Sequence, residues 1–328
     1  MTDQATIRKI TEGNRRAVAR AISLVEDEEA DSNRLLDALF SYTGKGYRIG
    51  ITGPPGAGKS TLTNRLAKHY RHDGLKVGII AVDPTSPFTG GALLGDRIRM
   101  TDVELDGEVF IRSMASRGSL GGLSKKAREA ADILDASGHQ IIILETVGVG
   151  QSELDIAGAA DTTIVVLVPE SGDGIQAMKA GLMEIADFFV LNKADRPGAD
   201  QAVQSIKMIL GLRDPEHGNG PRWVPEVLKT VGSEGKGIAE VANLVKLHKE
   251  FLTSSGDLVK KRTARLEQRI RHLVEEQLKE DFWTKERTEA LAVELQTVVE
   301  RGRTPYELAA GLIADFKKRT RKTEEHHG

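Results

Sequence analysis

The amino-acid sequence predicts an α/β protein with a doubly wound, mainly parallel sheet, and two observations lead to this fold class. Between residues 46 and 253, short runs rich in Ile, Val and Leu alternate with helical patterns. Several of these runs are apolar throughout, as in strands that are buried on both faces of a parallel sheet. The helical connections imply right-handed crossovers between the strands. We expect strands at residues 47–52, 76–82, 109–112, 140–145, 162–168, 188–191 and 227–231.

Residues 1–45 are expected to form a helical extension that precedes the domain of residues 46–253. A first helix, over residues 7–25, is indicated by apolar residues that recur largely three or four positions apart, which is the spacing of one buried helix face. A second, short helix is expected at residues 34–40, before the glycines at positions 44 and 46. The apolar residues of the first helix are Ile7, Ile10, Ala17, Val18, Ala21, Ile22 and Val25.

Residues 254–328 carry no strand signal and are expected to form a helical arm. Apolar periodicity indicates helices around residues 266–278 and 291–299. A third helix is expected to begin at residues 304–307, where Thr-Pro-Tyr-Glu forms a capping box with proline at the first helical position. It is expected to end near residues 317–319, whose basic side chains suit the negative end of a helix. Apolar stripes outside the main sheet need a partner, and we expect a second copy of this chain.

The composition of the 328-residue chain excludes several classes of function. Its formal net charge is −2, whereas proteins that bind polyanions normally have a basic surplus, so no nucleic acid is expected as a partner. The lack of cysteine excludes disulfides and thiolate metal sites. We find no signal peptide and no apolar run long enough to span a membrane. These features predict a cytoplasmic protein with no membrane partner.

Residues 53–60 match the pattern G-x-x-x-x-G-K-[ST] of a phosphate-binding loop at every position. The glycines let backbone N–H groups curl around a phosphate, and the helix that follows adds its positive end. Lys59 would reach the β- and γ-phosphates, and the Ser60 hydroxyl would coordinate Mg²⁺. The expected nucleotide-binding residues of this segment are Gly53, Pro54, Pro55, Gly56, Ala57, Gly58, Lys59, Ser60 and Thr61.

Asn192-Lys193-Ala194-Asp195 follows an expected strand and predicts recognition of guanine. The Asp195 carboxylate would accept hydrogen bonds from the ring N–H and the 2-amino group of guanine, and adenine has neither donor. Lys193 would lie along the base plane, and Asn192 would tie loops together. Backbone amides of Ser233, Glu234 and Gly235 would meet the guanine carbonyl, although this stretch alone is read equally well as a turn before a helix. GTP and GDP are therefore the expected ligands.

Acidic residues near the ends of predicted strands complete the expected Mg²⁺ site. The carboxyl ends of parallel strands line the ligand crevice of an open α/β sheet, and Mg²⁺ prefers hard oxygen ligands. Gly148 would sense the γ-phosphate through its N–H, which is a switch geometry. The expected metal residues are Ser60, Asp83, Asp96 and Glu145, and the candidate catalytic residues are Lys59, Asp96 and Glu145.

Taken together, these motifs resemble the MeaB/ArgK family of GTPases. The resemblance covers nearly the whole chain, and its most diagnostic part is the run Glu-Thr-Val-Gly-Val-Gly-Gln-Ser-Glu at residues 145–153. It implies a SIMIBI-class P-loop GTPase that chaperones an adenosylcobalamin-dependent acyl-CoA mutase, chiefly methylmalonyl-CoA mutase. It also implies a homodimer that forms through the C-terminal helical arm. The segments that carry the resemblance are residues 53–60, 83–86, 90–100, 145–153 and 192–195.

The resemblance further implies roles for single residues. Ser60 would coordinate Mg²⁺ with Asp83, Asp96 and Glu145 close by. Residues 172–179 would form a mobile switch that contains Asp173, Gln176 and Lys179, and Asp173 and Lys179 would couple the nucleotide to the mutase. One departure is the stretch at residues 112–116, Arg-Ser-Met-Ala-Ser, where relatives often have a proline-rich sequence.

Two alternative functions stay open from the sequence. A metallochaperone GTPase of the same class would need a cluster of Cys or His ligands, but this chain has no Cys and its histidines are scattered. A kinase or ATPase that serves amino-acid transport would bind ATP, which the Asp195 carboxylate disfavours. For a GTPase of either kind, mutase chaperone or metallochaperone, the sequence shows no recognisable water-positioning glutamine or finger arginine. Slow hydrolysis is therefore expected without a partner.

Overall fold

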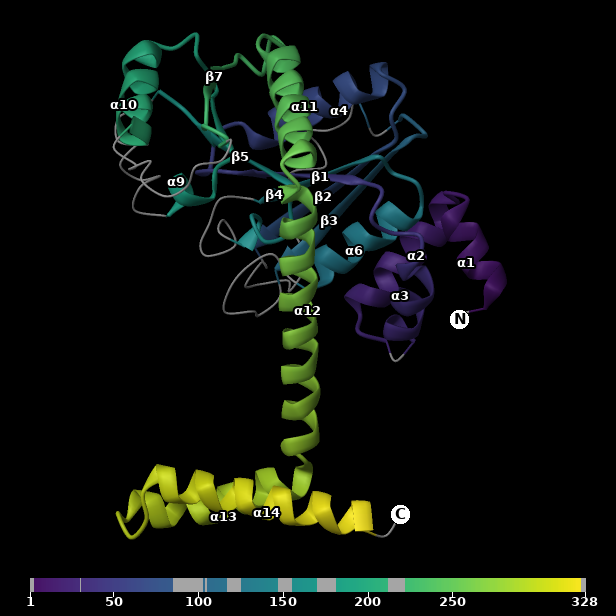
Figure 1. The fold of residues 1–328 in the computed structure, drawn as a ribbon, viewed down its shortest axis with the longest axis vertical. Coiled ribbons are helices and arrows are strands. Elements are labelled where there is room, and N and C mark those ends of the chain that lie inside the picture. The colour runs from purple at the N-terminus through teal and green to yellow at the C-terminus, as the bar shows by residue number, and fades with distance from the viewer. Residues whose placement is uncertain are drawn as a thin grey trace. The chain divides into compact units, whose positions relative to one another are not determined.

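The structure is a computed structural model that describes residues 3–29, 31–84, 103, 105–116, 125–146, 155–169, 181–211 and 222–325 (Figure 1). The chain divides into two compact units, residues 1–262 and residues 263–328. The first unit holds the sheet and the helices that cover it, and the second unit is helical.

Within the described residues, seven parallel strands form one sheet in the order β3-β2-β4-β1-β5-β6-β7. The first strand lies at its centre, between β4 and β5, so the chain leaves the middle of the sheet in both directions. This arrangement confirms the predicted doubly wound parallel class. The strands are β1 (Tyr47–Thr52), β2 (Val77–Pro84), β3 (Val109–Ser116), β4 (Ile141–Thr146), β5 (Thr162–Leu167), β6 (Phe188–Leu191) and β7 (Val227–Lys229).

Two strands differ in length from the prediction by two residues or more. Strand β3 runs four residues beyond Arg112, because it pairs with β2 as far as Pro84 opposite Ser116. Strand β7 ends at Lys229, whereas the prediction extended it to residue 231. The Thr230 N–H still donates to the Leu191 carbonyl of β6 at 2.9 Å, and the Thr230 carbonyl accepts from the Ala194 N–H in the turn after β6 at 3.0 Å.

Helices cover both faces of the sheet, and the alternation of strand side chains divides the core between them (Figure 1). On one face, Leu62 of α4 and Val241 of α11 pack in the same cluster as Ile143 of β4. On the other face, Ile22 of α2 packs in the cluster of α6 and Ile142 of β4. The helices of this unit are α1 (Gln4–Thr11), α2 (Arg15–Glu26), α3 (Ser32–Phe40), α4 (Lys59–His72), α6 (Lys125–Ala136), α9 (Leu182–Ile185), α10 (Ala199–Gly211) and α11 (Ile238–Ser254).

The prediction of one continuous helix from residue 7 to residue 25 is wrong. The chain turns at Gly13, whose φ of 79° suits glycine, and α2 starts afresh after Asn14. The Asn14 side chain accepts a hydrogen bond from the Ala17 N–H at 3.1 Å and so caps the second helix. The apolar period continued across this break because both helices bury residues in the same cluster.

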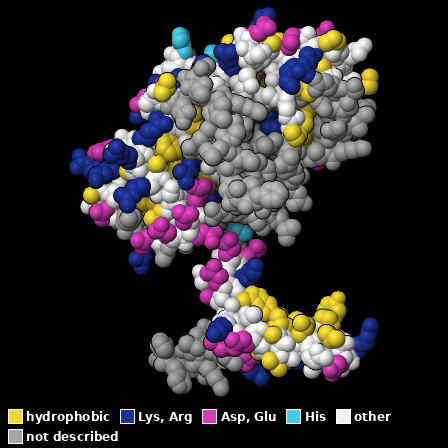
Figure 2. Space-filling model, turned by 180° about the vertical axis from the view of Figure 1, so that it is seen from behind, with side chains coloured by type: hydrophobic (Ala, Val, Ile, Leu, Met, Phe, Trp, Pro, Cys, Tyr) yellow, Lys and Arg dark blue, Asp and Glu magenta, His cyan; other side chains and the backbone are white. Residues whose placement is uncertain are grey.

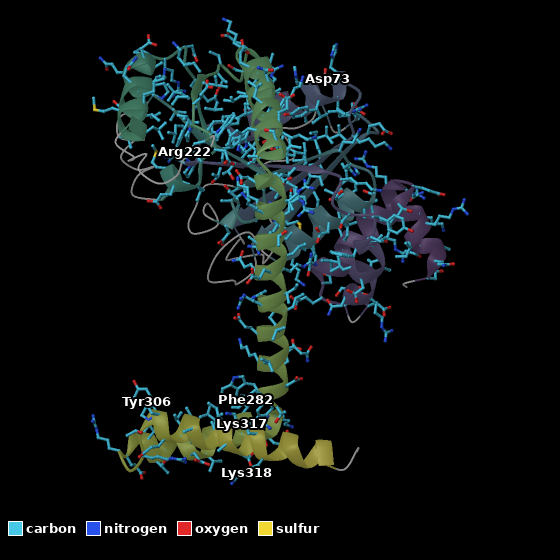
Figure 3. All side chains as sticks on the ribbon, in the orientation of Figure 1. Asp73, Arg222, Phe282, Tyr306, Lys317 and Lys318 are labelled. Atoms are coloured by element: carbon cyan, nitrogen blue, oxygen red, sulfur yellow. The ribbon has the colours of Figure 1, made fainter. Side chains whose placement is uncertain are left out.

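The C-terminal helices are α12 (Asp257–Phe282), α13 (Lys285–Val299) and α14 (Pro305–Glu325). The predicted capping box is confirmed, because Thr304 N–H donates to Glu307 Oε2 at 2.9 Å and Glu307 N–H donates to Thr304 Oγ1 at 3.2 Å. The predicted end near residues 317–319 is wrong. Lys317 and Lys318 lie within α14, as Figure 3 shows, because no glycine or proline interrupts the helix formers that follow.

None of the helices in the described ranges combines the length and the apolar character that a membrane crossing requires.

Candidate functional site

The phosphate-binding motif forms the turn between β1 and α4, at the carboxyl end of the central strand. Gly53 has φ 135°, and a side chain there would place its Cβ 2.1 Å from the Val166 carbonyl oxygen of β5. Gly58 has φ 89°, and its Cβ would lie 2.3 Å from Nδ2 of Asn192. The loop therefore needs glycine both for its backbone conformation and for the close approach of its neighbours.

Lys59 is the first residue of α4, and its side chain is buried. Its ammonium group donates hydrogen bonds to the carbonyl oxygens of Gly53 at 2.8 Å and Pro54 at 3.0 Å. The positive charge is therefore held against the loop that precedes it, at the amino end of a helix. Helix dipole and ammonium together give this turn the electrostatics of an anion site.

Ser60 and Glu145 meet across the ends of two neighbouring strands. Ser60 Oγ donates a hydrogen bond to Glu145 Oε1 at 2.5 Å, and the Glu145 carboxyl is buried. One residue further along β4, Thr146 Oγ1 donates to Thr52 Oγ1 at 2.9 Å. Because β4 pairs directly with β1, a residue that closes β4 lies beside the first turn of α4. A hydroxyl and a carboxylate at this point are the hard oxygen donors that Mg²⁺ prefers.

The other expected residues of the metal and switch sites fall outside the described part of the structure. Asp83 belongs to β2, which pairs with β4, but its side chain lies outside that part. Within the described residues, no group of three or more His, Cys, Asp or Glu side chains is placed to hold a metal ion. The remaining expected residues beyond the described ranges are Asp96, Gly148, Asp173, Gln176 and Lys179.

Asn192 connects the phosphate-binding loop with the loop that follows β7. Its side chain is buried, and Nδ2 donates a hydrogen bond to the Ala57 carbonyl at 2.9 Å. Its Oδ1 accepts from Thr230 Oγ1 and from the Gly232 N–H, both at 3.0 Å. The Asn192 side chain thus holds together the loop that follows β1 and the loop that follows β7.

Lys193 and Asp195 lie in the turn that Asn192 begins. Lys193 adopts a positive φ of 56°, and Ala194 N–H donates to the Thr230 carbonyl at 3.0 Å, which holds the turn against the end of β7. Asp195 is exposed. The pKa of the exposed Lys236 is raised mainly by its hydrogen bond to Glu234, with a smaller electrostatic contribution from Asp195.

The 231–236 loop is a closed turn with its own hydrogen bonds. Val231 N–H donates to the Lys236 carbonyl at 3.1 Å, and Glu234 N–H donates to the Val231 carbonyl at 3.0 Å. Arg65 of α4 also reaches it, with Nε 3.1 Å from the Gly232 carbonyl oxygen and Nη2 2.6 Å from that of Ser233. Arg65 is not among the residues that the sequence predicts for this site. Nothing in the motif marks it, since its contacts join residues 167 and 168 positions apart.

These features define the class of P-loop nucleotide-binding proteins. A glycine-rich loop and a buried lysine lie between the central strand and a helix, and Asn192 joins this loop to the 231–236 loop. Comparison with known proteins narrows the class. The model of the family described as methylmalonyl Co-A mutase-associated GTPase MeaB matches residues 18–287. The chain belongs to this family of GTPases, as the resemblance in the sequence predicted.

Individual relatives agree with this assignment. A Pyrococcus horikoshii protein that carries a provisional GTPase name is 52% identical over 268 residues, covering 82% of this chain and 84% of its own. The mouse mitochondrial protein named methylmalonic aciduria type A homolog is 32% identical over 296 residues, covering 84% of this chain and 70% of its own. The crystal structure of a LAO/AO transport system kinase matches with a TM-score of 0.71 and 29% identity, covering 98% of this chain and 99% of that chain.

Proposed function

We propose that this protein is a GTP-hydrolysing chaperone of an adenosylcobalamin-dependent acyl-CoA mutase, chiefly methylmalonyl-CoA mutase, and that GTP binding and hydrolysis gate cofactor loading and protection. The observation that carries the nucleotide part is the pair of hydrogen bonds through which Asn192 joins the phosphate loop to the base loop. The mutase part is supported by the description of the family to which the chain belongs. The protein would act in the cytoplasm.

Guanine would be selected by Asp195 and by the backbone of the 231–236 loop. The Asp195 carboxylate offers two acceptors to the ring N–H and the 2-amino group of guanine. Backbone amides among Ser233, Glu234 and Gly235 would meet the 6-oxygen. Because adenine lacks both donors and carries an amino group at position 6, it would leave the carboxylate and the amide without partners.

The phosphates would be held by the loop of residues 53–61, with Lys59 facing the β- and γ-phosphates. Mg²⁺ would be held through the hydroxyl of Ser60, with Glu145, Asp83 and Asp96 around it, and would supply neutralisation of phosphate charge when bound. The hydrogen bond between Ser60 and Glu145 supports this assignment, because it brings two oxygen donors together beside Lys59. Lys59 would stabilise the negative charge that develops on the phosphate oxygens during hydrolysis, and Glu145 and Asp96 would contribute by helping to hold Mg²⁺.

We further propose that the protein is a homodimer that forms through its C-terminal helices. Figure 2 shows hydrophobic side chains gathered on one side of this helical unit. On α12 the exposed apolar residues recur three or four positions apart, as on one helix face, and solvent exposure of such a stripe favours a partner. These residues are Leu266, Ile270, Leu273, Val274 and Leu278.

The test is the effect of a cobalamin-dependent mutase on GTP turnover. The isolated protein should hydrolyse GTP below about one turnover per second, because it offers no recognisable water-positioning glutamine or finger arginine. Addition of the cognate mutase from the same organism should accelerate turnover through the segment of residues 172–179. The Lys59→Ala variant, which should not turn over GTP, measures any phosphatase in the mutase preparation. If no cobalamin-dependent mutase of the organism binds the protein or alters its rate, the chaperone proposal is wrong.

A further inference from the structure

Arg65 binds the backbone of the 231–236 loop, which follows β7. Arg65 lies on α4, six residues beyond Lys59, and its guanidinium binds two successive backbone carbonyls, those of Gly232 and Ser233. A forked guanidinium that binds two acceptors fixes the orientation of both, unlike a lysine ammonium, which binds as a point charge. The preceding peptide group is also held, because the Gly232 N–H donates to Asn192 Oδ1 at 3.0 Å.

These two hydrogen bonds determine the direction in which the Ser233 N–H points. The described residues contain no cis peptide, so each carbonyl points opposite to the N–H of the residue that follows it. With the Gly232 carbonyl turned toward Arg65, the Ser233 N–H is turned away from it. With the Ser233 carbonyl also turned toward Arg65, the Glu234 N–H is turned away, and it donates to the Val231 carbonyl at 3.0 Å.

The Ser233 N–H therefore differs from its neighbours. The amides of Val231, Gly232, Glu234 and Gly235 all donate hydrogen bonds within the loop or to Asn192. Among the described residues, nothing accepts from the Ser233 N–H. A fixed backbone donor without a protein acceptor, in a loop that Asn192 joins to the phosphate-binding turn, is suited to a ligand oxygen.

We propose that Arg65 is a positioning residue that aims the Ser233 N–H at the 6-oxygen of guanine. The inference rests on the proposed GTP function, and it assigns different atoms of guanine to different residues. Asp195 reads the ring N–H and the 2-amino group, whereas Arg65 acts through the loop on the 6-position alone. Loss of Arg65 would let the 232–233 peptides rotate, so the donor would no longer be held in place before the nucleotide binds.

Two analogues separate these contributions. 6-Thio-GTP replaces only the 6-oxygen by sulfur, a larger and weaker acceptor, and inosine triphosphate lacks only the 2-amino group. The dissociation constants of GTP, ATP and both analogues are measured on the wild type and on Arg65→Ala, Arg65→Lys and Arg71→Ala. Arg71 is a matched control, because it is an arginine of the same helix that binds a backbone carbonyl, that of Leu75, and Asp106.

The wild type should bind GTP roughly 3- to 10-fold more tightly than 6-thio-GTP, which is the range of one neutral hydrogen bond. In Arg65→Ala this ratio should fall below about twofold, while the preference for GTP over inosine triphosphate stays at the wild-type value. Arg65→Lys keeps one donor and should give an intermediate ratio, and it also provides the reading if Arg65→Ala does not fold. Arg71→Ala should match the wild type in both ratios.

Three results overturn the inference. The first is an unchanged 6-thio ratio in Arg65→Ala. The second is an equal fall of both ratios, which means general loosening of the site. The third is a wild type that does not distinguish GTP from 6-thio-GTP, so that Ser233 does not bind the 6-oxygen. A wild type that prefers ATP to GTP has a separate meaning, because it contradicts the proposed GTP function itself.

Discussion

At the scale of single residues, the loops around Asn192 are held together by buried polar contacts. Asn192 uses both ends of its amide, donating to Ala57 and accepting from Thr230 and Gly232. A buried amide that loses its partners costs on the order of 1–3 kcal/mol, so this cluster has a strong preference for one arrangement. Asp195 differs, since it is exposed in the turn that follows. Its carboxylate can therefore be changed without disturbing the buried contacts.

That difference makes Asp195 suitable for a test of base recognition. Asp195→Asn replaces one carboxylate acceptor with an NH₂ donor, which would face the 2-amino group of guanine. Xanthine has a carbonyl at that position and keeps the neighbouring ring N–H. The variant should therefore prefer xanthosine triphosphate over GTP, and the wild type should show the reverse. Competition binding with GTP, ATP and xanthosine triphosphate measures this, and a variant that keeps its preference for GTP contradicts the role of Asp195.

At the scale of elements, α11 is joined to the amino ends of the strands by a buried chain of hydrogen bonds. Tyr47 Oη lies 2.6 Å from Thr162 Oγ1, which lies 2.8 Å from Nδ1 of His248 on α11. The other ring nitrogen lies 3.4 Å from an Asp187 carboxylate oxygen, and Trp223 packs on the imidazole with ring centroids 4.6 Å apart. These contacts lie at the amino ends of β1 and β5, whereas the phosphate-binding motif follows the carboxyl end of β1.

The same network predicts a pH dependence of stability. Burial lowers the pKa of His248 from 6.5 to about 4, against an opposing effect of the Asp187 carboxylate. The folded state therefore holds His248 neutral, while the unfolded chain takes up a proton once the pH falls below 6.5. Stability due to this group is complete above that pH and is lost as the pH falls toward about 4. Between pH 7.5 and pH 5 the loss should be about 2 kcal/mol.

Urea unfolding of the wild type and of His248→Gln at both pH values measures this effect. The glutamine cannot be protonated, so the loss between pH 7.5 and pH 5 should be smaller in the variant by about 2 kcal/mol. His72→Gln is the control, because the His72 side chain is 91% exposed and should leave the wild-type pH dependence intact. Equal pH dependence in the wild type and in His248→Gln would show that His248 is not held neutral.

At the scale of the whole molecule, the two units differ in how they bury apolar surface. The sheet unit has clusters of fully buried side chains on both faces of its strands. On α12 no described residue is buried, and α13 buries only Arg287, which lies near the rings of Phe282 and Phe316. Figure 3 marks Phe282 where α12 ends. A helical unit with so little core of its own is expected to gain stability from association.

Removal of residues 263–328 should therefore convert a dimer into a monomer that still binds nucleotide. The truncation follows Arg262, because that residue donates to Asp161 Oδ2 at 2.8 Å and to the Gly44 carbonyl at 2.6 Å within the sheet unit. Sedimentation of the intact and truncated chains at micromolar concentration measures the change. An intact chain that sediments as a monomer contradicts the dimer proposal.

A single substitution tests the interface without removing the helices. Ile270 is 61% exposed on the apolar stripe of α12, so Ile270→Lys should weaken the dimer by placing a charge in it. Leu105 is 93% exposed in the sheet unit, and Leu105→Lys should leave the dimer intact. Dissociation by both variants would point to a general effect of charge rather than to the stripe.

Local chemistry explains how much of this protein the sequence predicts. The turn between β1 and α4 requires glycine at Gly53 and Gly58, and the capping box at Thr304 and Glu307 closes within three residues. Such features depend on neighbours along the chain, so the sequence identifies them. Apolar runs likewise place all seven strands. The error at Asn14 has the opposite origin, because an apolar period reports burial against a shared core and not the continuity of one helix.

The sequence by itself determined the α/β class, the phosphate-binding turn and the family, because each is encoded in the types and spacing of nearby residues. Tertiary structure alone decided the strand order around β1, the meeting of Ser60 with Glu145, and the grip of Arg65 on the 231–236 loop. Ser60 and Glu145 are 85 positions apart, and Arg65 and Gly232 are 167. Contacts of that kind form only when packing brings distant segments together, and no local pattern records which segments will meet.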